Sequence, residues 1–304
     1  MTVHSEKNYK LFITDLDGTL LDDQKNIPVR NRQAIQKLVD HKIHCTVFTG
    51  RSYHSGVDIV RELGIQIPVV FQNGAMIMNP SSKEIIFQQG MHRKMAAEII
   101  MRGRKQSFLL IAYVSFLKIP DMLVEVDPKN PFPGYSSDSF PFQSYLAANQ
   151  PRILQVDDLY HSVLDGHPSI QMEKDGIPQV CVIGEIQLLN QFAFDLEKQF
   201  SGQISPIIST ILDGIGFLEI FGPNISKGHA LDELLKYYHV TPEETVFIGD
   251  NLNDVELMKR VGMPIAVANA PGEVQALCRW IAPSNEDTGV ASAIERFFFE
   301  RKDP

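Results

Sequence analysis

The sequence predicts an α/β fold with a parallel sheet, interrupted by an inserted α+β module. Strand-like and helix-like segments alternate through residues 1–85, and this alternation returns in residues 221–304. Between them, residues 86–220 mix strands and helices with longer loops. Because alternating strands and helices are typical of a parallel sheet with crossover helices, we expect a discontinuous core domain, 1–85 and 221–304, that carries the insert 86–220.

The elements of the first core segment follow from hydrophobic patterning and turn residues. Short apolar runs with β-branched residues predict strands, and apolar residues at helical spacing predict helices. Gly64 is expected to end the second helix. In chain order we expect a strand at 10–14, a helix at 29–42, a strand at 43–49, a helix at 52–64 and a strand at 67–74.

The same patterns place the remaining elements. A hairpin at 75–87, with Asn79 and Pro80 at its turn, precedes the insert. Within the insert we expect helices at 91–106 and 186–200, strands at 107–116, 179–185 and 216–222, and a loop rich in Pro, Gly and Ser at 129–142. The second core segment should contain a helix at 226–240, a strand at 244–249, a helix at 254–261 and a final strand at 264–269.

Composition and charge narrow the function classes. The 304 residues are 44% hydrophobic, and their net charge of −9 disfavours a broad nucleic-acid-binding surface. The N-terminal residues show no signal-peptide pattern, and no run of about 18 apolar residues predicts a membrane span. Cys45, Cys181 and Cys278 are far apart and are typical of buried thiols in a reducing compartment. We therefore expect a cytoplasmic protein with no nucleic-acid or membrane partner.

Polar residues directly follow four of the predicted core strands, where α/β sheets bind their ligands. If the strands are parallel, all four groups meet at one edge of the sheet. A single polar turn is common, because Asp and Asn favour turns, but four turns at matched positions indicate a ligand site. In chain order the groups are Asp15 and Asp17, then Thr49 to Arg51, then Asn73 and Gly74, then Asp250 to Asp254.

A calcium-binding EF-hand loop is one alternative for the acidic turns, and its spacing rules exclude it. Such a loop needs Gly at its sixth position and Glu at its twelfth. Counted from Asp15, these positions hold Leu20 and Asn26, and the turn at Asp250 fails in the same way. A solvated turn without a ligand is the second alternative for either acidic turn taken alone.

The interpretation that uses all four groups is metal-assisted phosphoryl chemistry. Asp15 and Asp250 suit Mg²⁺, a hard cation that proteins hold through one or two carboxylates and a substrate phosphate. A carboxylate such as Asp15 is also a competent nucleophile towards phosphorus. Asp17, two residues further along an extended chain, is placed to act as a general acid and base.

Donors for a phosphate are also present in the sequence. Lys227, at the start of a predicted helix, would stabilise the nucleophile and the bound phosphate, although a lysine there is more often a solvated surface residue. Thr49 and the amide of Gly50 would donate to phosphate oxygens after the second strand. Asn253 would bind the phosphate from the opposite turn.

Two charged residues at the same edge keep more than one role. Arg51 either assists with the phosphate or only pairs with a nearby acid. Asp254 either ligates the metal, directly or through water, or orients Lys227. The residue types alone do not decide between these roles.

The four motifs DLDGTLLDD, FTGR, Lys227 and GDNLND are similar, in order and spacing, to those of the haloacid dehalogenase-like hydrolases. The insert lies between the second and third motifs, and this placement and the GDxxND ending resemble the Cof-type subfamily, subclass IIB, with a C2B cap. The resemblance implies a Rossmann-like parallel-sheet core with an inserted α+β cap that closes over the site. The departures from the family pattern, AVANA near the last strand and Thr288, lie outside the four motifs.

The resemblance also implies a role for each motif residue. Asp15 would be the nucleophile and a Mg²⁺ ligand, and Asp250 the second carboxylate ligand. Asp17 would be the general acid/base and would offer its backbone carbonyl to the metal. The remaining positions are the phosphate-binding Thr49, Gly50, Lys227 and Asn253, the supporting Arg51 and Asp254, and the Asn-Gly-Ala turn that begins at the supporting Asn73.

From these residues and this resemblance we expect a Mg²⁺-dependent phosphatase. It would hydrolyse a small phosphorylated metabolite, such as a sugar phosphate, through an aspartyl-phosphate on Asp15. Two alternatives stay open, namely a phosphohexomutase on the same fold and a non-catalytic module that binds a phosphorylated ligand. The sequence identifies neither the substrate nor the oligomeric state.

Overall fold

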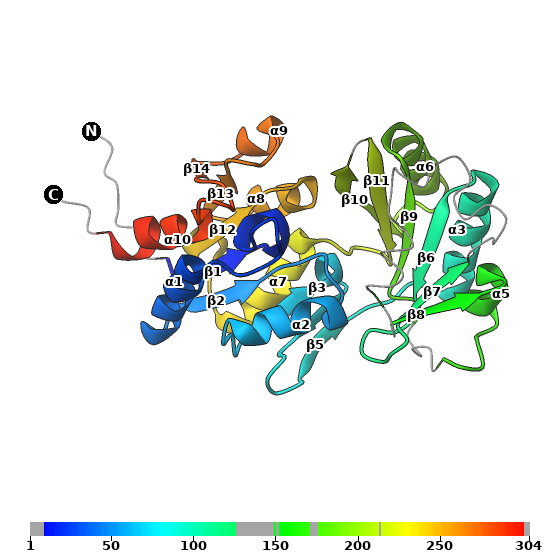
Figure 1. Ribbon diagram of the computed structural model, residues 1–304, viewed down its shortest axis with the longest axis horizontal. Coiled ribbons are helices and arrows are strands. Elements are labelled where there is room, and N and C mark those ends of the chain that lie inside the picture. The colour runs from blue at the N-terminus through cyan, green and yellow to red at the C-terminus, as the bar shows by residue number, and fades with distance from the viewer. Residues whose placement is uncertain (1–8, 126–148, 150–151, 171–175, 213, 301–304) are drawn as a thin grey trace. The chain divides into compact units, whose positions relative to one another are not determined.

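The computed structural model describes residues 9–125, 149, 152–170, 176–212 and 214–300. The chain forms two compact units (Figure 1), and the first combines Met1–Phe87 with Ser226–Pro304. The second unit, Gln88–Ile225, is the inserted one. It extends a few residues beyond the predicted end of the insert, because the backbone N–H of Ile225 donates a hydrogen bond to Ser205 within the insert.

The first unit is built on a five-stranded, wholly parallel sheet, as the sequence predicts. The strand order is β14-β13-β12-β1-β2. The central strand β1 is completely buried, which explains its continuous apolar run. The strands are β1 (Leu11–Thr14), β2 (His44–Val47), β12 (Thr245–Gly249), β13 (Met263–Val267) and β14 (Trp280–Ala282).

The predicted third strand differs from a regular member of this sheet. Strand β3 (Val69–Phe71) is joined to the β2 side by a single parallel bridge, between Phe48 and Val70. It pairs antiparallel with β4 (Met76–Met78), which continues into the hairpin strand β5 (Ile85–Gln88). Left-handed backbone at Gln72 to Gly74 reverses the chain after the three residues of β3, and hydrogen bonds to the loop after β2 hold this turn.

Helices flank the sheet of the first unit (Figure 1). Helices α1 and α10 lie side by side, because the buried Asn31 on α1 donates to the carbonyl of Leu20 and accepts from the N–H of Ala291 on α10. The strand predicted at 264–269 is present as β13, but the prediction that it is the final strand is wrong, because β14 and then α10 follow it. The helices are α1 (Val29–Asp40), α2 (Tyr53–Glu62), α7 (Lys227–Tyr238), α8 (Val255–Met258), α9 (Gly272–Gln275) and α10 (Gly289–Ile294).

The inserted unit contains a six-stranded sheet in the order β10-β11-β9-β6-β7-β8. Its neighbours are antiparallel except for the parallel pair β7 and β8. The mixed pattern matches the α+β texture that the sequence predicts. The strands are β6 (Leu109–Tyr113), β7 (Met122–Glu125), β8 (Ile153–Val156), β9 (Gln179–Glu185), β10 (Ser205–Leu212) and β11 (Ile215–Phe221).

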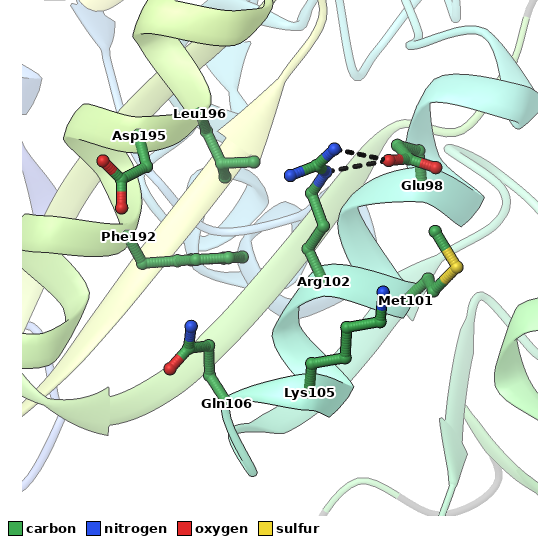
Figure 2. A pocket seen from close by; sticks show the side chains of 8 residues that line it. All are labelled: Glu98, Met101, Arg102, Lys105, Gln106, Phe192, Asp195 and Leu196. Atoms are coloured by element: carbon green, nitrogen blue, oxygen red, sulfur yellow. Dashed lines mark hydrogen bonds and ion pairs between the residues drawn. The ribbon is translucent and has the colours of Figure 1, made fainter.

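Three of the described helices pack on one face of this second sheet (Figure 1): α3 (Arg93–Lys105), α5 (Leu159–Leu164) and α6 (Ile186–Gln199). A hollow of about 180 Å³ lies between α3 and α6. Figure 2 shows the side chains that line it, among them Phe192 and the ion pair of Arg102 with Glu98. The predicted loop at 129–142 lies outside the described residues. None of the described helices is long and apolar enough to cross a membrane.

Candidate active site

Strand register brings the predicted site residues to one edge of the core sheet. Thr14, the last residue of β1, lies opposite Ile248 of β12 and Val47 of β2. The residues that follow these three strands therefore stand at the same level. The backbone N–H of Asp15 continues this pairing with a hydrogen bond to the carbonyl of Ile248.

Lys227 occupies the centre of the site. It is the first residue of α7, whose preceding residue, Ser226, caps the helix by accepting from the N–H of His229. Its ammonium nitrogen lies 2.7 Å from Oδ1 of Asp15 and 2.6 Å from Oδ1 of Asp254. Lys227 is only 1% exposed, so it is not the solvated surface residue that a lysine usually is.

Burial and the neighbouring charges shift the pKa values of Lys227 and Asp15. Burial acts to lower the pKa of Lys227, but the charges of Asp15 and Asp254 outweigh burial and raise it. Burial raises the pKa of Asp15 well above its ordinary value, although Lys227 acts in the opposite direction. The lysine is therefore a permanent cation that a neighbouring phosphate would meet.

Both carboxylate oxygens of Asp254 are occupied by protein donors. Oδ1 binds Lys227, and Oδ2 accepts the backbone N–H groups of Asp250 and Asn251 at 3.0 and 3.1 Å. Of the roles left open for Asp254, this geometry fits the orientation of Lys227. Neither carboxylate oxygen of Asp254 is therefore left for a metal ion alone.

Asp15 and Asp250 supply the carboxylate oxygens that suit a divalent cation. Ligand atoms of Asp15, Asp250 and Asp254 lie within 4.8 Å of one another. Lys227 takes Oδ1 of Asp15 and the Thr19 hydroxyl takes Oδ1 of Asp250, whereas among the described residues neither Oδ2 atom has a hydrogen-bond partner. Two carboxylates with one available oxygen each form the donor set that Mg²⁺ prefers.

The electrostatics of Asp250 indicate the same ligand. Burial and the charge of Asp254 raise the pKa of Asp250 to about 7. A metal cation beside Asp15 and Asp250 would offset the repulsion between these neighbouring carboxylates. Gly18 makes room for the cluster, because its φ is +73° and a Cβ there would lie 2.5 Å from Oδ2 of Asp250.

Asp17 lies in a different electrostatic environment from Asp15. Arg51 binds it with two hydrogen bonds, of 2.6 and 2.7 Å, and Lys25 approaches it to 3.0 Å. Burial acts to raise the pKa of Asp17, but these two cations outweigh burial and lower it. Of the roles left open for Arg51, this structure shows the pairing with a nearby acid.

The remaining predicted residues also lie at this edge of the sheet. Oγ1 of the buried Thr49 accepts from the N–H of Arg51, so its hydroxyl hydrogen can donate elsewhere. A Cβ at Gly50 would lie 3.3 Å from the amide nitrogen of Asn73. Nδ2 of Asn253 donates to Oδ1 of Asn73 at 2.9 Å. The structure thus brings together residues from all four predicted turns.

Two contacts of the site were absent from the sequence prediction. Thr19 holds Asp250, and its place in the motif after Asp17 was a usable signal. Lys25 reaches Asp17 from the loop before α1, and nothing in its sequence context distinguishes it from a surface lysine. Cys278, expected to be buried like the other two cysteines, is only half-buried.

Comparison with known proteins assigns the chain to a family. A family model described as haloacid dehalogenase-like hydrolase matches residues 12–294. The chain belongs to the haloacid dehalogenase-like hydrolases. The predicted family and the enzyme class, a phosphoric monoester hydrolase, are thereby confirmed.

Relatives of this haloacid dehalogenase-like hydrolase match it over almost its full length. Phosphatase YwpJ of Bacillus subtilis is 24% identical, and the match covers 93% of this chain and 97% of that protein. The 5-amino-6-(5-phospho-D-ribitylamino)uracil phosphatase YwtE of the same organism is 27% identical, with 94% and 97% covered.

Solved structures show the same haloacid dehalogenase-like fold. A haloacid dehalogenase-like hydrolase from Bacteroides thetaiotaomicron has a TM-score of 0.74 and 25% identity, covering 95% of this chain and 100% of that one. The subclass IIB sugar phosphatase BT4131 has a TM-score of 0.71 and 16% identity, covering 95% and 98%. The predicted parallel core with an inserted cap sheet is confirmed as the fold.

Proposed function

We propose that the chain is a Mg²⁺-dependent phosphatase that hydrolyses a small phosphorylated metabolite through an aspartyl-phosphate on Asp15. The observation that carries this proposal is the buried contact of Lys227 with Asp15, beside Asp250, at the carboxyl edge of the parallel sheet. A cation that touches the carboxylate also stands where it can neutralise an incoming phosphate. An ion pair with a purely structural role would not need the additional carboxylate of Asp250.

The reaction consists of two displacements at phosphorus. In the first, a carboxylate oxygen of Asp15 forms a bond to phosphorus, the bond from phosphorus to the substrate oxygen breaks, and Asp17 gives its proton to that leaving oxygen. In the second, Asp17 takes a proton from water, the water oxygen attacks phosphorus, and the bond to Asp15 breaks. The products are the dephosphorylated alcohol and inorganic phosphate.

The observed environment of Asp17 bears on both steps. Its ion pair with Arg51 favours the carboxylate, which is the form that accepts a proton from water in the second step. In the first step Asp17 must carry a proton, which requires this ion pair to open. Arg51 is therefore a supporting residue that biases the charge of Asp17.

The phosphate would be held by donors from three turns. Lys227, the hydroxyl of Thr49, the N–H of Gly50 and the amide of Asn253 would donate to the oxygen atoms of the dianionic phosphomonoester. When bound between Asp15 and Asp250, with the backbone carbonyl of Asp17 as a further ligand, Mg²⁺ would offset negative charge on the phosphoryl group.

The relatives support a small substrate. Several are described as phosphatases, three of them as 5-amino-6-(5-phospho-D-ribitylamino)uracil phosphatases, and the structural neighbour BT4131 is described as a sugar phosphatase. We propose a substrate of this size, with no nucleic-acid or membrane partner. The cytoplasmic location stays a prediction.

The experiment is Mg²⁺-dependent release of inorganic phosphate from an aryl phosphate and from a panel of phosphorylated metabolites. Asp15→Asn should lower kcat by more than about a thousandfold, and chelation by EDTA should abolish turnover. Asp58→Asn, on an exposed carboxylate of α2, is the matched control and should keep full activity. A folded Asp15→Asn protein that keeps full activity would refute the mechanism. Isomerisation of a hexose phosphate without net phosphate release would favour a mutase.

A further inference from the structure

The side chains of Asn253 and Asn73 meet although 180 residues separate them in the chain. Asn253 belongs to the short helical turn Leu252–Asp254 that follows β12, and Asn73 to the turn that follows β3. Nδ2 of Asn253 donates to Oδ1 of Asn73 over 2.9 Å. Asn73 is fully buried, whereas Asn253 is half-buried at the edge of the site.

The backbone that presents Asn73 is strained. Gln72 and Asn73 have φ values of 48° and 52°, and Gly74 follows with 110°. Side-chain-bearing residues adopt this left-handed region at a cost, and such strain concentrates at functional sites. Asparagine tolerates it better than most residues.

Contacts on both sides hold this strained turn in place. The N–H of Asn73 donates to the carbonyl of Thr49 at 3.0 Å, and the N–H of Gln72 donates to the carbonyl of Arg51 at 2.9 Å. On the other side, a Cβ at Gly74 would lie 2.5 Å from the carbonyl oxygen of Ser226. The turn is thus held between the loop after β2, which contains Thr49 and Arg51, and Ser226, the residue before Lys227.

We infer that Asn73 is a positioning residue that fixes the orientation of the Asn253 amide for phosphate binding. An asparagine side chain presents either its NH₂ or its oxygen to a given direction, depending on how the amide is turned. Because Oδ1 of Asn73 accepts one hydrogen of Nδ2, the NH₂ end of Asn253 is selected and its second hydrogen can donate to a phosphate oxygen. Without Asn73, the side-chain amide of Asn253 can turn its oxygen towards the phosphate, and the phosphate oxygens repel that oxygen.

This inference rests on the proposed function only insofar as the site binds phosphate. It is tested by the affinity for inorganic phosphate in the presence of Mg²⁺, measured by isothermal titration calorimetry, which needs no turnover. A protein that binds phosphate but hydrolyses no phosphomonoester would contradict the proposed function and leave this inference intact.

The decisive variants form a double-mutant cycle of Asn73→Gly and Asn253→Ala. Glycine keeps the left-handed backbone of residue 73 and removes only the amide. Asn253→Ala should weaken phosphate binding about tenfold, since a hydrogen bond to a charged group is lost, and Asn73→Gly should weaken it about three- to tenfold. The double variant should match Asn253→Ala within about twofold, because Asn73 acts through Asn253.

The cycle also separates a positioning role from a merely structural one. Lys83→Gly replaces another left-handed residue, on the exposed β4–β5 hairpin, and should leave phosphate affinity unchanged. In turnover assays with an aryl phosphate, Asn73→Gly should raise KM more than it lowers kcat. Unchanged phosphate affinity in Asn73→Gly, or losses that multiply in the double variant, would overturn the inference.

Discussion

Lys227 illustrates how individual residues set the electrostatics of the site. Burial alone would favour its neutral form, and only the two carboxylates of Asp15 and Asp254 keep it charged. Asp254 in turn is fixed by two backbone N–H groups, so the cation is held by a framework and not by the nucleophile alone. In the proposed mechanism, this arrangement would let Asp15 change its bonding while Lys227 stays in place.

At the same scale, the raised pKa of Asp250 predicts a pH-dependent stability of the metal-free protein. Its pKa is about 7 in the folded state, against an ordinary value of 3.8. Between these values the folded state binds more protons than the unfolded state, so the free energy of unfolding falls as the pH rises. In EDTA, the melting temperature should decrease from about pH 5 to pH 8.

The variant Asp250→Asn and added Mg²⁺ identify the source of this effect. Asp250→Asn should weaken the pH dependence in EDTA, because one of the two buried carboxyls with a raised pKa is gone and only Asp15 remains. In the wild-type protein the stabilisation by Mg²⁺ should grow with pH, because binding requires the ionised carboxylates. Identical pH profiles for wild type and Asp250→Asn in EDTA would contradict the prediction.

At the scale of elements, the turn after β1 requires glycine at position 18. Gly18 and Gly202 have nearly equal φ values, +73° and +71°, but differ in their surroundings. A Cβ at Gly18 would meet the carboxylate of Asp250, whereas a Cβ at Gly202 would meet nothing within 4 Å. The two positions therefore separate backbone strain from collision with the carboxylate of Asp250.

We predict different outcomes for the two alanine substitutions. Gly202→Ala should cost about 1 kcal/mol, which is the strain of left-handed alanine alone. Gly18→Ala should cost more, and it should also abolish the rise in melting temperature on adding Mg²⁺, because Asp250 is displaced. Scanning fluorimetry with and without Mg²⁺ measures both quantities. Equal losses of stability with an intact Mg²⁺ response would show that the collision is relieved elsewhere.

Most elements with a clear apolar pattern were predictable from the sequence, although the eight-residue strand β10 was not predicted. Strand β1 and helix α7 follow directly from an apolar run and from helical spacing after a Ser cap. Strand β3 has the composition of a core strand, but the left-handed turn after it depends on tertiary contacts to Thr49 and Ser226. The three-residue β14 carries too little pattern to be recognised.

In the site, too, the sequence predicts which residues take part but not which side chains contact one another. The positions of Asp15, Asp250 and Lys227 follow from motif spacing and strand ends, and the structure brings them together. The partner of Arg51 and the occupied oxygens of Asp254 could not be predicted, because both depend on which side chains meet across the sheet edge. Their chemical roles, and the action of the insert as a cap, stay predictions.

At the scale of the whole molecule, the chain consists of two units with separate hydrophobic cores. All of the candidate ligands of Mg²⁺ belong to the first unit. Because separate domains need not unfold together, we predict two thermal transitions, of which Mg²⁺ raises only one. Differential scanning calorimetry with EDTA and with Mg²⁺ measures this.

A core substitution in the insert assigns the second transition. Leu218→Ala, in the fully buried part of β11, should reduce the free energy of unfolding of the insert by about 2–5 kcal/mol and so lower the midpoint temperature of its transition. Leu188→Ala, at a half-exposed position on α6, is the matched control and should have little effect. A single transition that responds to both Mg²⁺ and Leu218→Ala would show that the units unfold as one.

The division of labour between the two units has a consequence for how such a chain can change over generations. Every candidate site residue described at the sheet edge lies outside Gln88–Ile225, so this candidate constellation is encoded in two flanking segments. Mutation or recombination within the middle of the gene leaves that constellation intact. Descendants of one ancestor can therefore diversify the insert while they inherit the same strand ends.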